Sequence, residues 1–199
     1  MSEKREAIVA AALDVIEEDG LSGFTQPRVA QRAGLRQSHL TYYFPTRADL
    51  LLAVAEEAVR RRIEVLRAAV SAEDPATKVA GLVEVLVDPR QTRILMALTQ
   101  GADADPGVRR AFVALGAGIA PLGATLLESF GAEPTEASLA LLQATSTGIA
   151  VLALASGGEA FRDRAEQVLT QLLTGPLNEQ HRTGTGITHR STDVREAPA

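Results

Sequence analysis

Apolar residues recur at helical spacing along most of the chain. Within residues 3–19 the apolar positions fall three and four residues apart, as on one face of an amphipathic helix: Ile8, Ala11, Ala12, Val15 and Ile16. Gly20 follows and is suited to end this helix, because glycine adopts a left-handed conformation without strain. No strand-length run of alternating β-branched residues stands out, so the pattern predicts an all-α protein.

Two short helices are predicted next. Thr25 is suited to cap a helix that Gly34 ends. A second helix is predicted over about residues 36–44, because Leu40 and Phe44 fall four apart on one apolar face. Only about three residues are left to join the two helices, so the chain must turn sharply between them.

Six further helices are predicted in the rest of the chain, which gives about nine in total. Thr46 and Asp49 match a capping box, so a long helix is expected to run from there to about residue 70. The others are predicted at about residues 76–87, 90–100, 108–130, 135–156 and 159–174. Residues 101–107, GADADPG, are a predicted loop, and Pro121 is expected to kink or break its helix.

Composition is typical of a folded protein without disulfide bonds. The chain has 199 residues, 46% of them hydrophobic, and no cysteine, which excludes a disulfide framework and a thiolate zinc site. Charges flank the first apolar stretch on both sides, unlike in a signal peptide. The most apolar window, residues 139–155, is shorter than the roughly 20 residues of a membrane span and contains polar side chains. We therefore expect a cytoplasmic protein with no membrane contact.

Positive charge is concentrated in one window of an otherwise acidic chain. The formal net charge is −5, yet residues 20–48 contain four arginines and no acidic residue: Arg28, Arg32, Arg36 and Arg47. An anionic partner is therefore expected to bind there. The acidic residues 17–19 just before the window and the arginines 60–62 after it are interpreted as solvated helix surfaces without a role.

The two short helices match a helix-turn-helix. Small Ala30 stands where the helices would cross, and Gly34 stands at the sharp turn. In this motif the second helix lies in the major groove of DNA. With Leu40 and Phe44 facing inward, the side chains that remain for the groove are Arg36, Gln37, Ser38, His39, Thr41, Tyr42 and Tyr43.

These residue types suit double-stranded DNA as the partner. Arginine and glutamine can form paired hydrogen bonds with base edges, while serine, threonine and histidine reach bases or phosphates. Tyrosine hydroxyls commonly donate to phosphates. Thr25 and Gln26 offer backbone donors at a positive helix end, which favours a further phosphate contact. Arg47 begins the next helix beside the same surface and is also a candidate DNA contact.

Four ordered stretches resemble the TetR family of transcriptional regulators. They are a first helix that ends in Gly20-Leu21, FTQPRVAQRAG at 24–34, LRQSHLTYYF at 35–44 and the PTRADLL that follows, in all about the first 55 residues. The resemblance implies a homodimer that binds a partly palindromic operator, usually as a repressor. It also implies release by a small molecule in a pocket of the carboxy-terminal helices, the last two of which form the dimer's four-helix bundle.

The resemblance implies a division of the chain into two domains and a tail. Residues 1–48 are expected to form the helix-turn-helix domain, and residues 49–174 the effector-binding and dimerisation domain. Residues 175–199 lack helical periodicity and are rich in threonine and glycine, so a disordered tail is expected. The family usually reads Leu-Tyr-x-His-Phe where this chain has LTYYF at 40–44, so a phosphate clamp is expected at Tyr42 and Tyr43.

Candidate residues for the pocket and the dimer come from the helical pattern. The pocket candidates combine apolar with weakly polar side chains: Met96, Thr99, Phe112, Leu126, Gln143 and Thr147. An apolar or weakly polar effector is therefore expected. The dimer candidates form a face of small residues completed by leucines: Ala140, Ala144, Gly148, Leu152, Leu169 and Leu173.

Other functions remain open from the sequence. The same fold can serve as a partner-binding adaptor that has lost DNA binding, and a small helical enzyme is disfavoured because no convergent set of His, Asp or Lys is evident. Ser38 and His39 do not form a nucleophile and base pair, since adjacent helical residues point about 100° apart. No metal or cofactor is expected.

Overall fold

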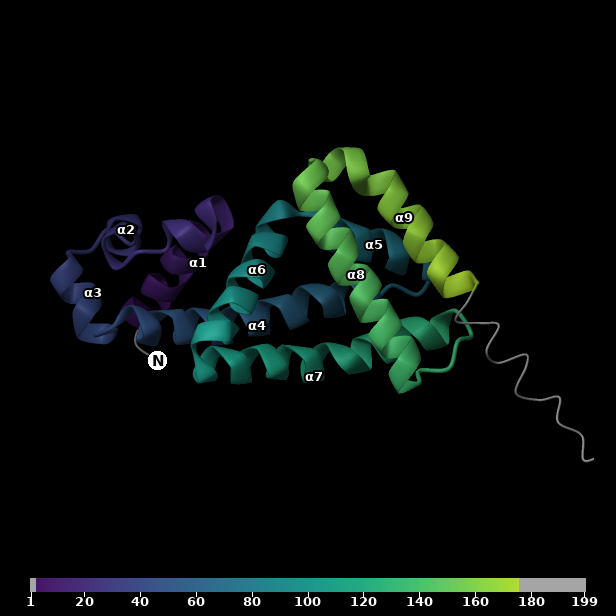
Figure 1. Cartoon of the computed structure of the whole chain (residues 1–199), viewed down its shortest axis with the longest axis horizontal. Coiled ribbons are helices and arrows are strands. Elements are labelled where there is room, and N and C mark those ends of the chain that lie inside the picture. The colour runs from purple at the N-terminus through teal and green to yellow at the C-terminus, as the bar shows by residue number, and fades with distance from the viewer. Residues whose placement is uncertain (1–2, 176–199) are drawn as a thin grey trace, which may run out of the picture.

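The computed structural model describes residues 3–175 and folds them into nine α-helices, without a strand in that part of the chain (Figure 1). The helices are α1 Glu3–Gly23, α2 Gln26–Arg32, α3 Gln37–Tyr43, α4 Arg47–Val70, α5 Pro75–Val87, α6 Pro89–Ala104, α7 Pro106–Ser129, α8 Glu136–Ser156 and α9 Gly158–Thr174. The all-α prediction is confirmed. Except for Gly175, the predicted disordered tail lies outside the described residues.

Helices α1 to α3 form one end of the molecule (Figure 1). The apolar face predicted for α1 is buried, with Ile8, Val15 and Ile16 at most 1% exposed. Gly20 interrupts α1 with a φ of 69° and a ψ of −171°, which only glycine adopts readily, and a last helical turn follows to Gly23. This short turn directs the chain toward α2.

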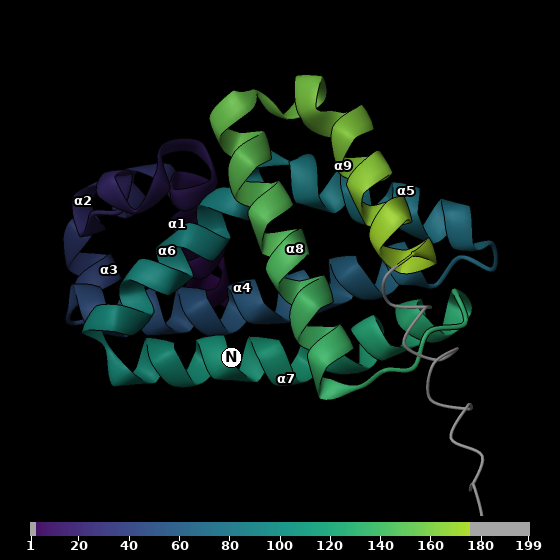
Figure 2. The ribbon, with the colours of Figure 1, turned by 45° about the vertical axis from the view of Figure 1, so that its right-hand side comes forward.

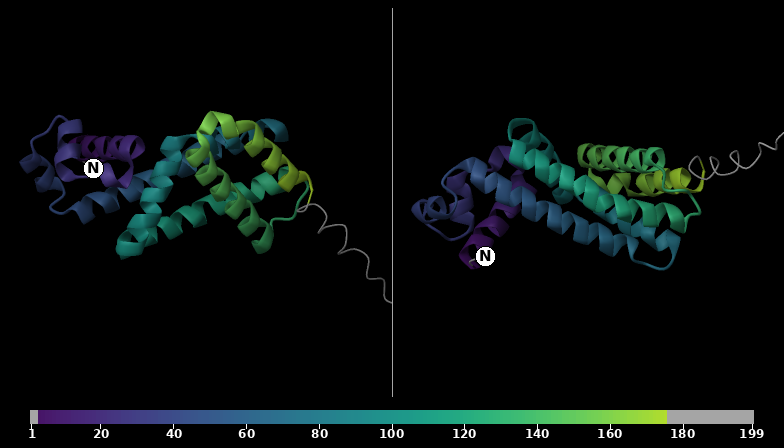
Figure 3. Two further views of the ribbon diagram at one scale, coloured as in Figure 1. Left: turned by 45° about the horizontal axis from the view of Figure 1, so that its top comes forward. Right: turned by 90° about the horizontal axis from the view of Figure 1, so that it is seen from below.

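The long helix α4 connects this end to the rest of the molecule. It begins in the predicted capping box, in which the Thr46 hydroxyl accepts from the Asp49 amide at 3.0 Å and the Asp49 carboxylate accepts from the Thr46 amide at 3.0 Å. Leu50 and Val54 enter the same core as α1, and this core continues into α6 and α7. Helices α4 and α7 lie side by side along most of their length (Figure 3).

A second core joins α5, the end of α7, α8 and α9. Helices α8 and α9 lie side by side and cover α5 (Figure 2). Leu169 and Leu173 of α9 are fully buried in this core, at 0% exposure each. By length and composition alone, α7 and α8 are each apolar enough to cross a membrane. In the fold both are built into the helical bundle, α7 on α4 and α8 on α5 and α9.

The loop predicted at residues 101–107 is wrong. Helix α6 continues to Ala104, and α7 begins after the single residue Asp105. The Asp105 carboxylate caps α7 by accepting from the amides of Gly107 at 2.7 Å and Val108 at 3.2 Å. Gly101 lies inside α6 and packs closely on its neighbours: a Cβ there would lie 3.0 Å from Val108. Pro121 does not break its helix either, since α7 runs on to Ser129.

Candidate functional site

The turn between α2 and α3 is held by main-chain and side-chain hydrogen bonds. The Thr25 hydroxyl accepts from the amide of Arg28 at 3.4 Å and caps α2. Gly34 has a φ of +66°, as its place at the sharp turn requires. The Gln26 side-chain amide donates to the Phe44 carbonyl at 2.9 Å and thereby ties the start of α2 to the end of α3. A phosphate contact of Gln26 is therefore expected from its backbone amide.

Helix α3 presents a polar face to solvent. Leu40 and Phe44, predicted to face inward, are 0% and 2% exposed, which confirms the orientation of the helix. Four of the predicted DNA contacts are exposed at its amino end: Arg36, Gln37, Ser38 and His39. Thr41 is half-buried, and its hydroxyl donates to the Ser38 carbonyl at 3.1 Å. Contact of these residues with DNA stays a prediction.

The two neighbouring tyrosines have different environments. Tyr42 is 80% exposed, whereas Tyr43 is half-buried and packs against the first core. Their rings meet edge to face, with centroids 5.2 Å apart and an interplanar angle of 90°. Tyr43 therefore supports the ring of Tyr42, and Tyr42 has the hydroxyl more accessible to a phosphate.

Two of the four arginines in the basic window are paired with carboxylates of α1. Arg28 lies 2.5 Å from Asp19, and Arg32 forms a two-pronged contact with Glu18, one prong of which measures 2.8 Å. Hydrogen bonding from Arg32 lowers the pKa of Glu18, so this pair stays charged near neutrality. Glu18 and Asp19 are exposed, as predicted for a solvated helix end, and both carboxylates also pair with arginines of α2.

Arg36 and Arg47 are the arginines of the window for which no ion pair forms among the described residues. The Arg47 guanidinium donates from Nε to the Phe24 carbonyl at 3.1 Å and lies 5.2 Å from the centre of the Phe24 ring. Arg5 of α1 lies over the ring of Phe44, 5.0 Å from its centre. Arg5, which the sequence reading did not identify, thus adds a positive charge near the end of α3.

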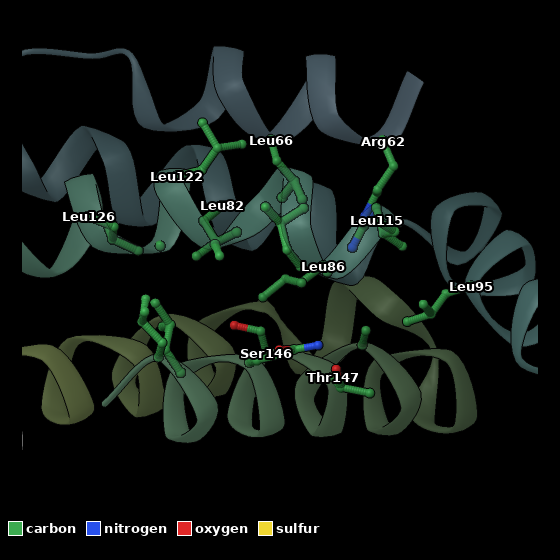
Figure 4. A pocket seen from close by; sticks show the side chains of 18 of the residues that line it. Arg62, Leu66, Leu82, Leu86, Leu95, Leu115, Leu122, Leu126, Ser146 and Thr147 are labelled. Carbon is green, nitrogen blue, oxygen red and sulfur yellow. The ribbon is translucent and has the colours of Figure 1, made fainter. Parts of the chain in front are cut away.

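A cavity of about 390 Å³ lies among α4, α5, α6, α7 and α8 (Figure 4). Five of the predicted pocket residues line it: Thr99, Phe112, Leu126, Gln143 and Thr147. The prediction of the sixth residue, Met96, was wrong, because Met96 is 39% exposed and does not line the cavity. Leu95 and Thr99 are four residues apart and share the face of α6 that does, whereas Met96 points about 100° away from Leu95.

Arg62 lines the same cavity, although the sequence placed residues 60–62 on a solvated surface. That interpretation holds for Arg60 and Arg61, which pair with Glu57 at 2.6 and 2.8 Å. It was wrong for Arg62, which donates to the Gln91 side-chain oxygen at 3.3 Å. Burial lowers the pKa of Arg62 to about 10, so the side chain remains charged at neutral pH.

The predicted dimer face is accessible on α8 and buried on α9. Ala140 and Ala144 are exposed and Leu152 is 54% exposed, while a Cβ added at Gly148 would meet no atom within 4 Å. Leu169 and Leu173 were wrongly assigned to this face: they are 0% exposed, so the protomer's own core leaves no surface of theirs for a second chain. The helical pattern also places Leu141 and Val168 on this face, and both have accessible surface, at 43% and 36% exposure.

Both parts of the chain match known family models. Residues 8–54 match the model of bacterial regulatory proteins of the tetR family, and residues 70–175 match that of the tetracyclin repressor-like C-terminal domain. Among curated proteins, the regulator RutR from Escherichia coli strain K12 is 37% identical over 57 residues, which are 29% of this chain and 27% of RutR. The match thus spans about a quarter of that relative.

Solved structures share the fold over most of the chain. A transcriptional regulator from Rhodococcus sp. Rha1 superposes with a TM-score of 0.72 at 24% identity, covering 85% of this chain and 93% of that one. A regulator from Saccharomonospora viridis, solved in complex with choline, gives a TM-score of 0.73 at 18% identity and covers 87% and 96%. At these identities the likeness concerns the fold.

Proposed function

The chain belongs to the TetR family of bacterial regulatory proteins, and from this we propose that it is a DNA-binding transcriptional regulator, a repressor that a small molecule releases from its operator. The exposed polar face of α3 carries this proposal. Arg36, Gln37 and Tyr42 project from it while Leu40 and Phe44 hold the helix against the core. Such a face has the donors that base edges and phosphates accept from. A regulator of this kind works in the cytoplasm, where the DNA is.

A second copy of the chain is the proposed partner in DNA binding. The accessible small residues of α8, Ala140, Ala144 and Gly148, allow another helix to approach closely. Exposed Leu141 and Leu152 on the same helix supply apolar surface for such a contact. Two copies related by a two-fold axis would present two α3 helices to an operator with two matching half-sites.

The cavity among α4 to α8 is the proposed effector site. Its volume of about 390 Å³ is within the range of pockets for small molecules. The choline complex of the Saccharomonospora viridis regulator supports the idea that this fold accommodates a small molecule. Occupation of the cavity is proposed to lower the affinity for DNA, because α4 and α6 both line it and both contact α1 of the DNA-binding end.

DNA binding is tested with duplexes taken from beside the protein's own gene. In a mobility-shift assay the protein should retard at least one such duplex in the presence of excess unrelated DNA. The affinity should fall steeply as salt rises, because phosphate contacts release counterions. Retardation of all duplexes alike, or of none, would contradict the proposal. A stable protein partner lost on Arg36→Ala, in a mixture without DNA, would instead support an adaptor.

A further inference from the structure

The lining of the cavity is mostly apolar but includes one positively charged side chain. Of the described residues that line it, Arg62 alone carries a charge. Most of the others are aliphatic, among them Leu66, Leu82, Leu86 and Leu126. A charged group in such surroundings loses hydration, and its charged form is favoured again only by an opposite charge or by strong hydrogen bonds.

Among the described residues, no anionic group lies at hydrogen-bond distance from Arg62. Its hydrogen-bond acceptor is the neutral side-chain oxygen of Gln91 at 3.3 Å, and no carboxylate of the described residues forms an ion pair with it. Asp88 acts on it from farther away, and the Asp88 carboxylate accepts from the Arg90 amide at 2.9 Å. Arg60 and Arg61, by contrast, are both paired with Glu57 on the outside.

Polar side chains line the wall opposite Arg62. Figure 4 shows the Arg62 side chain reaching from α4 toward α8, where Ser146 and Thr147 lie. Leu122 and Leu126 lie farther along the cavity. The cavity therefore combines a cation and two hydroxyl groups with a lining that is otherwise mostly apolar. A ligand with an anionic head group and an apolar body would match both the polar and the apolar part of the lining.

We propose that the effector is an amphipathic anion, with one carboxylate that binds Arg62 and an apolar body that fills the rest of the cavity. The proposal deepens the proposed function and rests on it, since it names the class of effector for the same cavity. It replaces the expectation of an apolar or weakly polar effector. Because Arg62 stays charged far above neutral pH, the guanidinium is available to a carboxylate under physiological conditions. The carboxylate takes over or shares the donors that Arg62 now directs to Gln91.

Calorimetry on the full chain without DNA tests this inference with matched ligands. One set is octanoate, octan-1-ol and octylamine, and the other is 4-phenylbutanoate, 4-phenylbutan-1-ol and 4-phenylbutylamine. Within each set the apolar body is constant and only the head group changes. The acid is expected to bind at least about tenfold more tightly than the alcohol and the amine, as a charge-assisted hydrogen bond implies.

Two variants of Arg62 and one surface control complete the experiment. Arg62→Met should abolish the preference for the acid while the alcohols still bind, and Arg62→Lys should retain most of it. Arg61→Met, which removes a half-buried arginine of the same helix that pairs with Glu57 and does not line the cavity, should leave the preference unchanged. Thermal melting of each variant checks that it is folded. If Arg62→Met is unfolded, the comparison of acid, alcohol and amine affinities on the wild-type protein still tests the inference.

Equal binding of acid and alcohol, no binding of either acid, or an acid preference that survives Arg62→Met would overturn the inference. None of these results depends on DNA, so they leave the proposed regulator intact. Failure to bind any DNA selectively would overturn the proposed function whatever the ligand preference. The two failures are therefore distinguishable.

Discussion

The Arg93 guanidinium donates to the main-chain carbonyl of Glu17 at 2.7 Å and joins α6 to α1, although the two residues are 76 positions apart in sequence. Arg93 lies on α6, the helix that also contributes Leu95 and Thr99 to the cavity wall. Glu17 lies near the end of α1, just before the interruption at Gly20. The bond thus attaches the wall of the cavity to the helix that leads into the helix-turn-helix.

Removal of this bond should loosen the end of α1. In Arg93→Ala the Glu17 carbonyl loses a charged donor, so the free energy of unfolding should fall by about 1–3 kcal/mol. Hydrogen exchange of backbone amides at residues 17–23 should become faster, while exchange in α5 and α9 should change little. Arg110→Ala, which removes an exposed arginine from α7, is the control. Unchanged protection at residues 17–23 would show that the bond does not hold this segment.

Two substitutions on α3 test its role in DNA recognition. Arg36→Ala should weaken binding to the operator by about 1–3 kcal/mol, at least fivefold, if Arg36 contacts a base edge. Tyr42→Phe should cost about 1 kcal/mol through loss of a hydroxyl donor to phosphate. Both side chains are exposed, so melting temperatures should stay near that of the wild type. Fluorescence anisotropy with labelled operator measures the affinities.

The control for these substitutions is Arg60→Ala, since Arg60 is exposed on α4 and pairs with Glu57 and Glu64. This variant also removes one positive charge, but at a position on α4 rather than at α3. A loss of affinity as large as that of Arg36→Ala would mean that net charge, rather than contact by α3, governs binding. Unaltered affinity in both Arg36→Ala and Tyr42→Phe would rule out the proposed recognition face.

The carboxylates of Glu18 and Asp19 should restrain nonspecific binding to DNA. They neutralise Arg32 and Arg28, so a Glu18→Gln and Asp19→Asn double variant frees two positive charges beside α2. Affinity for an unrelated duplex should rise several-fold at low salt and depend more steeply on salt, because more phosphates are neutralised. Titrations at several salt concentrations measure the slope. An unchanged slope would indicate that Arg28 and Arg32 lie out of reach of DNA.

A large side chain at Gly148 should prevent dimerisation without unfolding the protomer. A Cβ at this position would meet no atom within 4 Å, so Gly148→Arg has room in the isolated chain. On the proposed dimer face the arginine would separate the α8 helices and place a charge in an apolar contact. Sedimentation should therefore show a monomer with unchanged helical content. Gly148→Ala, with only a methyl group added, is the matched control and should stay dimeric.

Local spacing was sufficient to predict most of the helices and the orientation of α3. Leu40 and Phe44 are four residues apart, and Thr25 and Thr46 are capping residues, so the signals lie within one or two turns. The loop predicted at residues 101–107 failed because Gly, Asp and Pro also suit a close helix contact, a cap and a first helical turn. The same residue types occur in loops and at closely packed helix ends, and only tertiary packing distinguishes the two.

Tertiary relationships were the part that the sequence left undetermined. An apolar stripe shows that a helix face is buried but does not show against what, which is why Leu169 and Leu173 were assigned to a dimer. Arg62 was grouped with Arg60 and Arg61, although each step along a helix turns the side chain by about 100°. The acidic partners of Arg28 and Arg32 lie in α1, outside residues 20–48, so the net charge of that window did not reveal the two ion pairs.

The most direct measurement for the central claim is selection of bound DNA from a library of random duplexes. The wild-type protein is predicted to enrich an inverted repeat with two equal half-sites, because a dimer presents two copies of α3. Arg36→Ala should lose the enrichment while remaining folded. Recovery of no sequence above its frequency in the starting library would contradict the claim that this chain recognises an operator.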